Sequence, residues 1–162
     1  MSGSPEDPRQ RLARNLNDLL QELRVALAGV QILFGFLLSI VFTVPYQHTT
    51  ALQRGAHLIA VLFSVIAVAL MTAPAAWHRL LFRQGERPEI VRVSNTFAIG
   101  GLVCLALAMS ATVFLLADVV LGNWSATVAC ALSMAWFGML WFGLPLRHRL
   151  TAAERNSIGS VR

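Results

Sequence analysis

Charged residues are scarce in this chain: Asp, Glu, Lys and Arg make up 13% of its 162 residues, about half the share found in soluble domains. Apolar residues make up 56% of the chain, so a soluble fold would have too little polar surface to cover itself. Lysine is absent, and all thirteen basic residues are arginines that lie between apolar runs. A nucleic-acid-binding surface would need a continuous basic stripe or patch. The composition therefore excludes a nucleic-acid partner and predicts a protein that folds in lipid.

Motifs for catalysis and metal binding are also lacking. The two cysteines, Cys104 and Cys130, lie inside apolar runs and not in C-x-x-C or Cys/His ligand spacing. Paired histidines in a helix bundle can ligate haem, but the four histidines lie at or beyond the ends of the apolar runs: His48, His57, His78 and His148. The sequence has no Gly-rich phosphate loop, no H-E-x-x-H and no G-x-S-x-G. We therefore expect no enzyme activity, no catalytic residue, no cofactor and no metal site.

Long charge-free stretches are the clearest positive feature. They contain 29, 24, 25 and 28 residues between successive formal charges, and each can hold a membrane-spanning helix of about 20 residues. A lipid-exposed backbone must satisfy its own hydrogen bonds, so these stretches should be helical. The sequence predicts an all-α fold, an integral membrane four-helix bundle, with spans at 25–43, 56–76, 96–117 and 124–143.

The arginines predict the orientation of these spans. Twelve of the thirteen lie in the N-terminal segment, the second loop and the C-terminal tail, and only Arg54 lies in the other two loops. Positive residues are retained on the cytoplasmic side of a membrane. We therefore expect both termini to be cytoplasmic, with 1–24 as a cytoplasmic segment, 25–143 as the membrane domain and 144–162 as a basic cytoplasmic tail.

The N-terminal segment has its own helix signals. Asp7, Pro8 and Gln10 have the spacing of a helix cap, a helix-starting proline and a near capping box. Leucines then recur at helical spacing opposite polar and charged residues. This pattern predicts an amphipathic helix that lies in the cytoplasmic interface and runs into the first span.

Two stripes of small or polar residues recur every four positions inside the spans. The first contains Gln31, Gly35, Ser39 and Thr43, and the second contains Gly100, Cys104, Ala108 and Thr112. Such residues let helix backbones approach closely. We interpret both stripes as packing faces of the bundle, with Gln31 as an interhelical hydrogen-bonding group worth about 1 kcal/mol; the alternative is a substrate path.

Asp118 is the only acidic residue outside the predicted cytoplasmic segments. A proton-carrying role is one alternative, because ionisable residues inside membranes are usually functional. Its position at the outer end of the third span favours a solvated or paired carboxylate instead. Arg54 is the only formal positive charge on that side, so the sequence predicts an Arg54–Asp118 pair.

Two segments carry a family resemblance: one runs from Glu22 through Arg24 to Gln31 and continues to Leu38, and the other is Ala73–Arg83. Both resemble an uncharacterised family of small bacterial membrane proteins. Members of this family have no established activity and are sometimes labelled sodium:proton antiporters. The resemblance implies a location in the bacterial plasma membrane. By matching motif positions, it singles out five polar residues of unknown role: Glu22, Arg24, Gln31, His78 and Arg79.

Three function classes follow from these observations. The favoured one is a non-enzymatic multi-pass membrane protein that acts by association, either as a homo-oligomer or with a membrane protein partner. The alternative is a small cation/proton antiporter or other transporter that works as an oligomer. However, no acidic residue lies inside the first span, where small four-span multidrug exporters carry a glutamate. A membrane redox protein would need cofactor ligands that the sequence does not offer.

Overall fold

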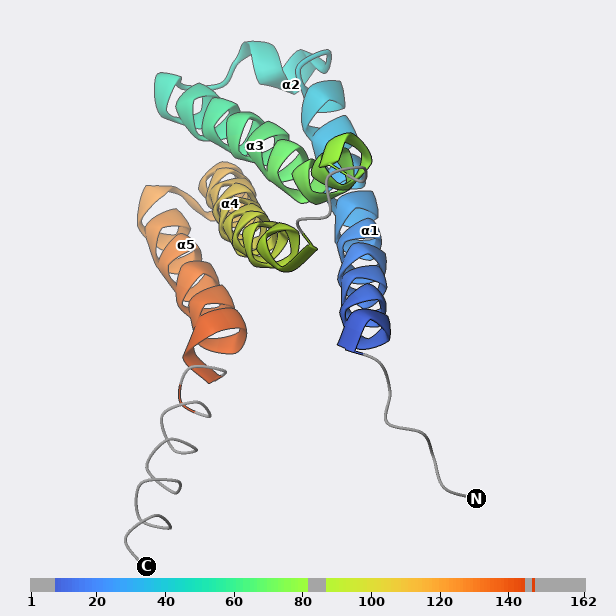
Figure 1. Ribbon diagram of the computed structural model, residues 1–162. Coiled ribbons are helices and arrows are strands. Elements are labelled where there is room, and N and C mark those ends of the chain that lie inside the picture. Colours follow the sequence, from blue (N-terminus) through green and yellow to red (C-terminus); the bar gives the residue numbers. More distant parts are fainter. Residues whose placement is uncertain (1–7, 82–86, 145–146, 148–162) are drawn as a thin grey trace, which may run out of the picture.

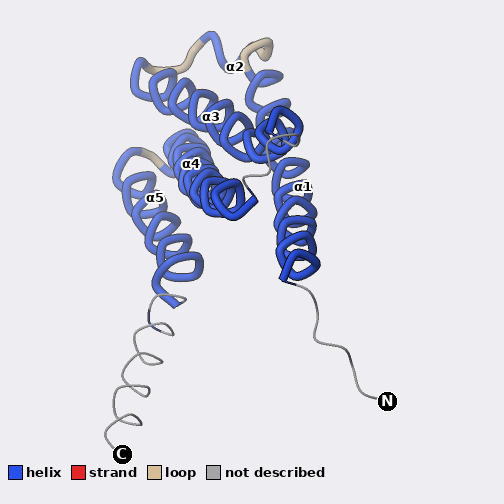
Figure 2. The backbone as a smooth tube through the Cα atoms, viewed as in Figure 1, coloured by secondary structure: helices blue, strands red, loops and turns tan. Residues whose placement is uncertain are grey.

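The computed structural model describes residues 8–81, 87–144 and 147, and every element in these ranges is a helix (Figures 1 and 2). The elements are α1 (Pro8–Ile40), α2 (Val44–Gln47), α3 (Ala51–Leu81), α4 (Arg87–Leu121), α5 (Asn123–Gly138) and a π-helical turn, η1 (Met139–Gly143). The prediction of an all-α fold is therefore confirmed for the described residues.

Four segments of these helices are long and apolar enough to cross a membrane: Leu20–Ile40, Ala51–Ala76, Val93–Leu121 and Trp124–Gly143. They match the four predicted spans, but the first three begin three to five residues earlier than expected. The first also ends at Ile40, three residues before the predicted boundary. Leu20 and Val93 lie inside α1 and α4, which begin at Pro8 and Arg87, so these two segments continue helices that start outside the apolar stretch. The predicted starts lie later because they were placed after formal charges, and charged residues can be helical near the end of a span.

The predicted N-terminal amphipathic helix runs without a break into the first apolar segment, as expected. α1 is one continuous helix of 33 residues that begins at Pro8, as the predicted cap required. Leu23, Val30 and Leu37 recur every seventh residue along α1 and are at most 5% exposed. This seam packs against the rest of the molecule, while Arg14, Asn17, Asp18, Gln21 and Glu22 are exposed as the amphipathic pattern predicted.

Local signals fix the other helix starts. Thr50 and Gln53 form a capping box at the start of α3: the backbone N–H of Gln53 donates to Thr50 Oγ1 (3.2 Å), and that of Thr50 donates to Gln53 Oε1 (3.0 Å). Gly122 separates α4 from α5 with a φ of 95°, a conformation that favours glycine. Gly122 therefore forms the turn between α4 and α5.

The long helices pack in the order α1, α3, α4, α5. Contact is most extensive between α3 and α4, followed by α4 with α5 and α1 with α3, whereas α1 touches α4 only slightly. Within the described residues α5 has no comparable contact with α1 or α3, and Figure 1 shows α1 and α5 at opposite edges. The arrangement is therefore more open than the predicted four-helix bundle.

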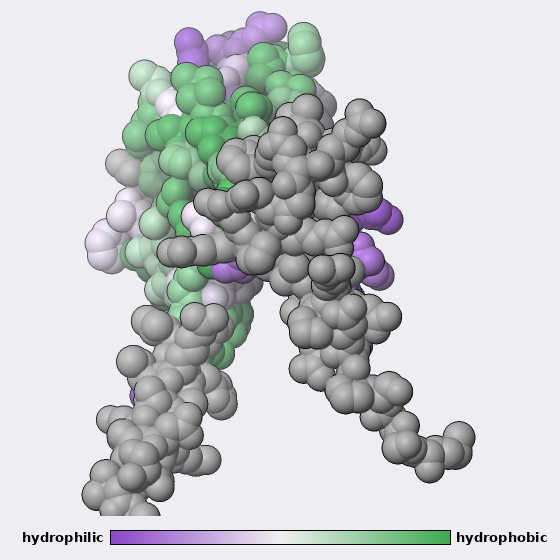
Figure 3. Space-filling view, viewed as in Figure 1, coloured by the Kyte–Doolittle hydropathy of each residue, from purple (hydrophilic) through white to green (hydrophobic). Residues whose placement is uncertain are grey.

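The surface of the described residues is largely apolar. Large side chains such as Phe42, Trp124 and Trp136 are 88%, 82% and 65% exposed. Figure 3 shows hydrophobic residues along the side of the molecule and hydrophilic ones gathered at the end that carries α2. This end, which also contains the start of α3 and the α4–α5 turn, is called the α2 end below.

Candidate functional site

The small-residue stripe of α4 is a packing face, as predicted. Ala108 is fully buried, and Gly100, Cys104 and Thr112 are half-buried. The closest approach is at the neighbouring Gly101, where an added Cβ would lie 2.7 Å from Met71 Cγ and 3.4 Å from the Ala67 carbonyl oxygen. Glycine is thus required at this point because it lets α3 and α4 meet.

The corresponding stripe of α1 does not pack within the chain. Gln31, Gly35, Ser39 and Thr43 are all exposed, and an added Cβ at Gly35 would meet nothing within 4 Å. At 3.6 residues per turn, Gly35 and Ser39 lie about 140° and 180° around α1 from the buried seam of Leu23, Val30 and Leu37, whereas Gln31 lies about 100° from it and Thr43 follows the end of the helix. The prediction that this stripe is an intramolecular packing face is therefore wrong, because α1 packs through its larger residues.

Gln31 is the one polar side chain of the α1 stripe that makes no hydrogen bond to the described residues. The Ser39 hydroxyl donates to the Phe36 carbonyl oxygen (2.8 Å), and the Thr43 hydroxyl donates to that of Ile40 (2.7 Å). The Gln31 amide has no hydrogen-bond partner among the described residues. It lies near the middle of the apolar segment Leu20–Ile40 and carries both donors and an acceptor.

Asp118 is held by an uncharged partner. Its Oδ2 accepts a hydrogen bond from Gln53 Nε2 at 2.9 Å. Gln53 thus caps α3 through its amide oxygen and anchors the end of α4 through its amide nitrogen. The sequence signalled the capping role, because Thr50 and Gln53 have capping-box spacing, but it gave no signal for the bond to Asp118.

Arg54 does not pair with Asp118 in the structure. Its Nη2 donates to the backbone oxygen of Thr49 (3.0 Å) and its Nε to the Thr49 hydroxyl (3.4 Å). The predicted ion pair is therefore replaced by two separate interactions at the α2 end. The prediction failed because it considered only formal charges, whereas a neighbouring glutamine amide supplies the donor for the carboxylate.

His57 lies one turn further along α3 and is 4% exposed. Its Nδ1 is buried with no hydrogen-bond partner among the described residues. The ring meets Tyr46 of α2 edge to face, with 5.1 Å between ring centroids. Sequence position alone placed His57 at the end of a span and did not reveal this burial.

The remaining predicted residues lie toward the opposite end of the apolar segments of α1 and α3. Glu22 and Arg24 are exposed on α1. His78 and Arg79 lie in the last turn of α3, but their side chains lie outside the described part of the structure. The contacts therefore do not bring these four residues together with Gln31, Arg54 or Asp118.

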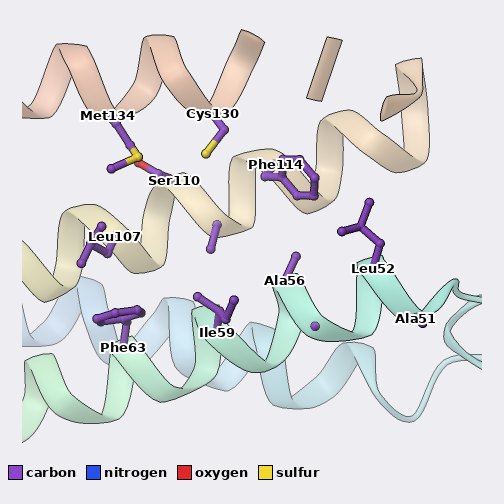
Figure 4. A pocket seen from close by; sticks show the side chains of 12 residues that line it. Ala51, Leu52, Ala56, Ile59, Phe63, Leu107, Ser110, Phe114, Cys130 and Met134 are labelled. Atoms are coloured by element: carbon purple, nitrogen blue, oxygen red, sulfur yellow. The ribbon is translucent and has the colours of Figure 1, made fainter. Parts of the chain in front are cut away.

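An apolar groove of about 440 Å³ runs over α4 between α3 and α5. Figure 4 shows Ile59 and Phe63 of α3, Phe114 of α4 and Met134 of α5 around it. Ser110 of α4 and Ser133 of α5 connect these two helices, with 3.2 Å between their hydroxyl oxygens. Among the described residues, no three His, Cys, Asp or Glu side chains are grouped so that they could hold a metal ion.

These features define an all-helical protein with four helices compatible with membrane spans. The chain belongs to a family of unknown function, DUF6328, whose model matches residues 5–145. The comparisons found no match among curated proteins or among solved structures. The predicted membership of a family without an established activity is therefore confirmed, and the family assigns no function.

Proposed function

We propose that this protein is a non-enzymatic, multi-pass protein of the bacterial plasma membrane that acts by association, and that its first partner is a second copy of itself. The observation that carries the proposal is the exposed, unpartnered Gln31 amide in the middle of the apolar segment of α1. In hydrocarbon, a polar group without a partner costs free energy. A second helix that supplied the partner would remove this cost.

A second copy fits this face for two reasons. The amide is self-complementary, because each Gln31 can donate to and accept from its symmetry mate about a two-fold axis. Gly35 and Ser39 lie one and two turns further along the same face, so two α1 backbones can approach closely there. The Ser39 hydroxyl already donates a hydrogen bond within its own helix, so its proton needs no acceptor from the second copy.

Cysteine cross-linking tests this proposal directly. In a background with Cys104→Ala and Cys130→Ala, Gly35→Cys should give an oxidative dimer in membranes. Val30→Cys, on the buried face of α1, should not. Leu132→Cys, exposed on α5, controls for random collision.

The contribution of Gln31 can be measured in the same assay. Gln31→Leu should weaken the dimer roughly fivefold, which corresponds to about 1 kcal/mol for an interhelical hydrogen bond. Gln31→Asn should retain part of the dimer because it keeps the amide. Cross-linking no stronger at Gly35→Cys than at Leu132→Cys would show that the α1 face does not bind a second copy.

The proposed orientation places both chain ends in the cytoplasm, supported by the arginine distribution. In the same background, Gln47→Cys should react with an impermeant thiol reagent added outside, and Gln84→Cys should not. The reverse pattern would contradict the orientation.

A further inference from the structure

The α2 end contains a cavity of about 480 Å³ between α1, α2 and α4. Its body is lined by apolar side chains, including Phe36 and Leu37 of α1 and Leu115 and Leu116 of α4. Thr43, His48, Thr49 and Gln53 add polar groups to the lining from the connection between α1 and α3 and from the first turn of α3. A concave, mostly apolar site with a few polar groups is typical of ligand binding.

Two opposite charges are held by residues of this lining. Arg54 donates to Thr49, and Asp118 accepts from Gln53. Only two of the five guanidinium N–H groups are used in these bonds, and Asp118 Oδ1 has no hydrogen-bond partner among the described residues. The cavity therefore adjoins one cationic and one anionic group that are not paired with each other.

We propose that this cavity binds one chain of a zwitterionic phospholipid whose head group carries a phosphate and a primary ammonium. The phosphate would meet Arg54, since guanidinium donors match phosphate oxygens. The ammonium would donate to Asp118, and the acyl chain would lie in the apolar body. This inference rests on the proposal that the chain lies in a membrane, but it does not require the α1 dimer.

The charge arrangement favours this occupant over other lipids. An anionic lipid without an ammonium would satisfy Arg54 and leave the Asp118 carboxylate near a second negative charge. A choline head group carries a positive charge but no N–H, so it cannot donate a hydrogen bond to the carboxylate. The structure therefore predicts a preference for phosphatidylethanolamine over both phosphatidylglycerol and phosphatidylcholine.

Native mass spectrometry of the full chain in detergent tests this preference, with the three lipids supplied at matched chain length. Phosphatidylethanolamine should be retained roughly threefold or more over the other two, the range expected for partly exposed charge pairs. Asp118→Asn should reduce its retention to that of phosphatidylcholine. Arg54→Gln should reduce retention of all three lipids, whereas Arg24→Gln, exposed on α1 at the opposite end, should change none.

A cavity-filling variant separates lipid binding from changes in folding. Leu116 lines the cavity and is 65% exposed, so Leu116→Trp should block the acyl chain and lower retention of every lipid without changing the melting temperature. Equal retention of the three lipids, or a preference for phosphatidylglycerol, would overturn the proposal. A lipid-free dimer that Leu116→Trp disrupts would show instead that a second copy fills the cavity.

Discussion

The two small-residue stripes have the same four-residue spacing but opposite surroundings. On α4, Ala108 is buried, and Gly101 beside the stripe lies against Met71 and Ala67 of α3. On α1, Gly35 faces open space, and Gln31 has no partner among the described residues. A stripe of this kind therefore marks a surface suited to close packing, and it does not say whether the partner lies in the same chain.

Matched glycine substitutions should give the largest difference between the stripes. Gly101→Val places a side chain where even a Cβ would lie 2.7 Å from Met71 Cγ, so it should destabilise the fold by roughly 1–3 kcal/mol. Gly35→Val meets no neighbouring atom, and valine is a better helix former than glycine. Its effect on stability should be within about 0.5 kcal/mol.

Thermal unfolding in detergent, at dilution where dimers dissociate, measures both variants. For a chain of this size, about 1 kcal/mol shifts the melting temperature by roughly 2–4 °C. A loss of stability in Gly35→Val equal to that in Gly101→Val would show that the α1 stripe packs inside the protomer after all.

The stripes also show what could be predicted from the sequence. Four charge-free stretches were enough to locate four helices. In lipid, the backbone of a long apolar run can satisfy its hydrogen bonds only as a helix or within a closed barrel. The spacing of Gln31, Gly35 and Ser39 could not reveal which way the stripe faces, because α1 is apolar on several sides and either side can meet lipid. Inward and outward faces of such a helix differ in packing more than in polarity.

Predictions at the α2 end failed for a different reason. The Arg54–Asp118 pair was inferred by matching formal charges, and a neutral amide, Gln53, holds the carboxylate instead. The Thr50 and Gln53 spacing could have identified the start of α3. The burial of His57 against Tyr46 depends on how α2 folds back, which no local pattern specifies.

A double-mutant cycle should sharpen the comparison at the end of α4. Asp118→Ala and Gln53→Ala should show a coupling of about 1 kcal/mol, because the hydrogen bond involves a charged but only partly buried group. Gln53→Ala also removes the capping box, and the cycle subtracts that separate effect. Arg54→Ala and Asp118→Ala should show coupling close to zero, measured by the same unfolding assay. Coupling larger for Arg54 than for Gln53 would restore the ion pair predicted from the sequence.

The smallest expected effect is that of the α1 stripe on ion transport, because this stripe carries no group suited to proton exchange. An exchanger needs an ionisable group inside the membrane with access to both sides. The α1 stripe offers an amide and two hydroxyls, which do not titrate in the working pH range. Arg54, His57 and Asp118 all lie toward the α2 end, far from the opposite end of the apolar helices.

Proteoliposomes that contain the protein and an internal pH dye should therefore show no sodium- or potassium-dependent proton flux above that of empty vesicles. Gln31→Leu should leave this background unchanged, since an amide side chain carries no titratable proton. A robust flux that Asp118→Asn abolishes would mean that the α2 end opens toward both sides of the membrane. The antiporter alternative would then replace association as the function of this chain.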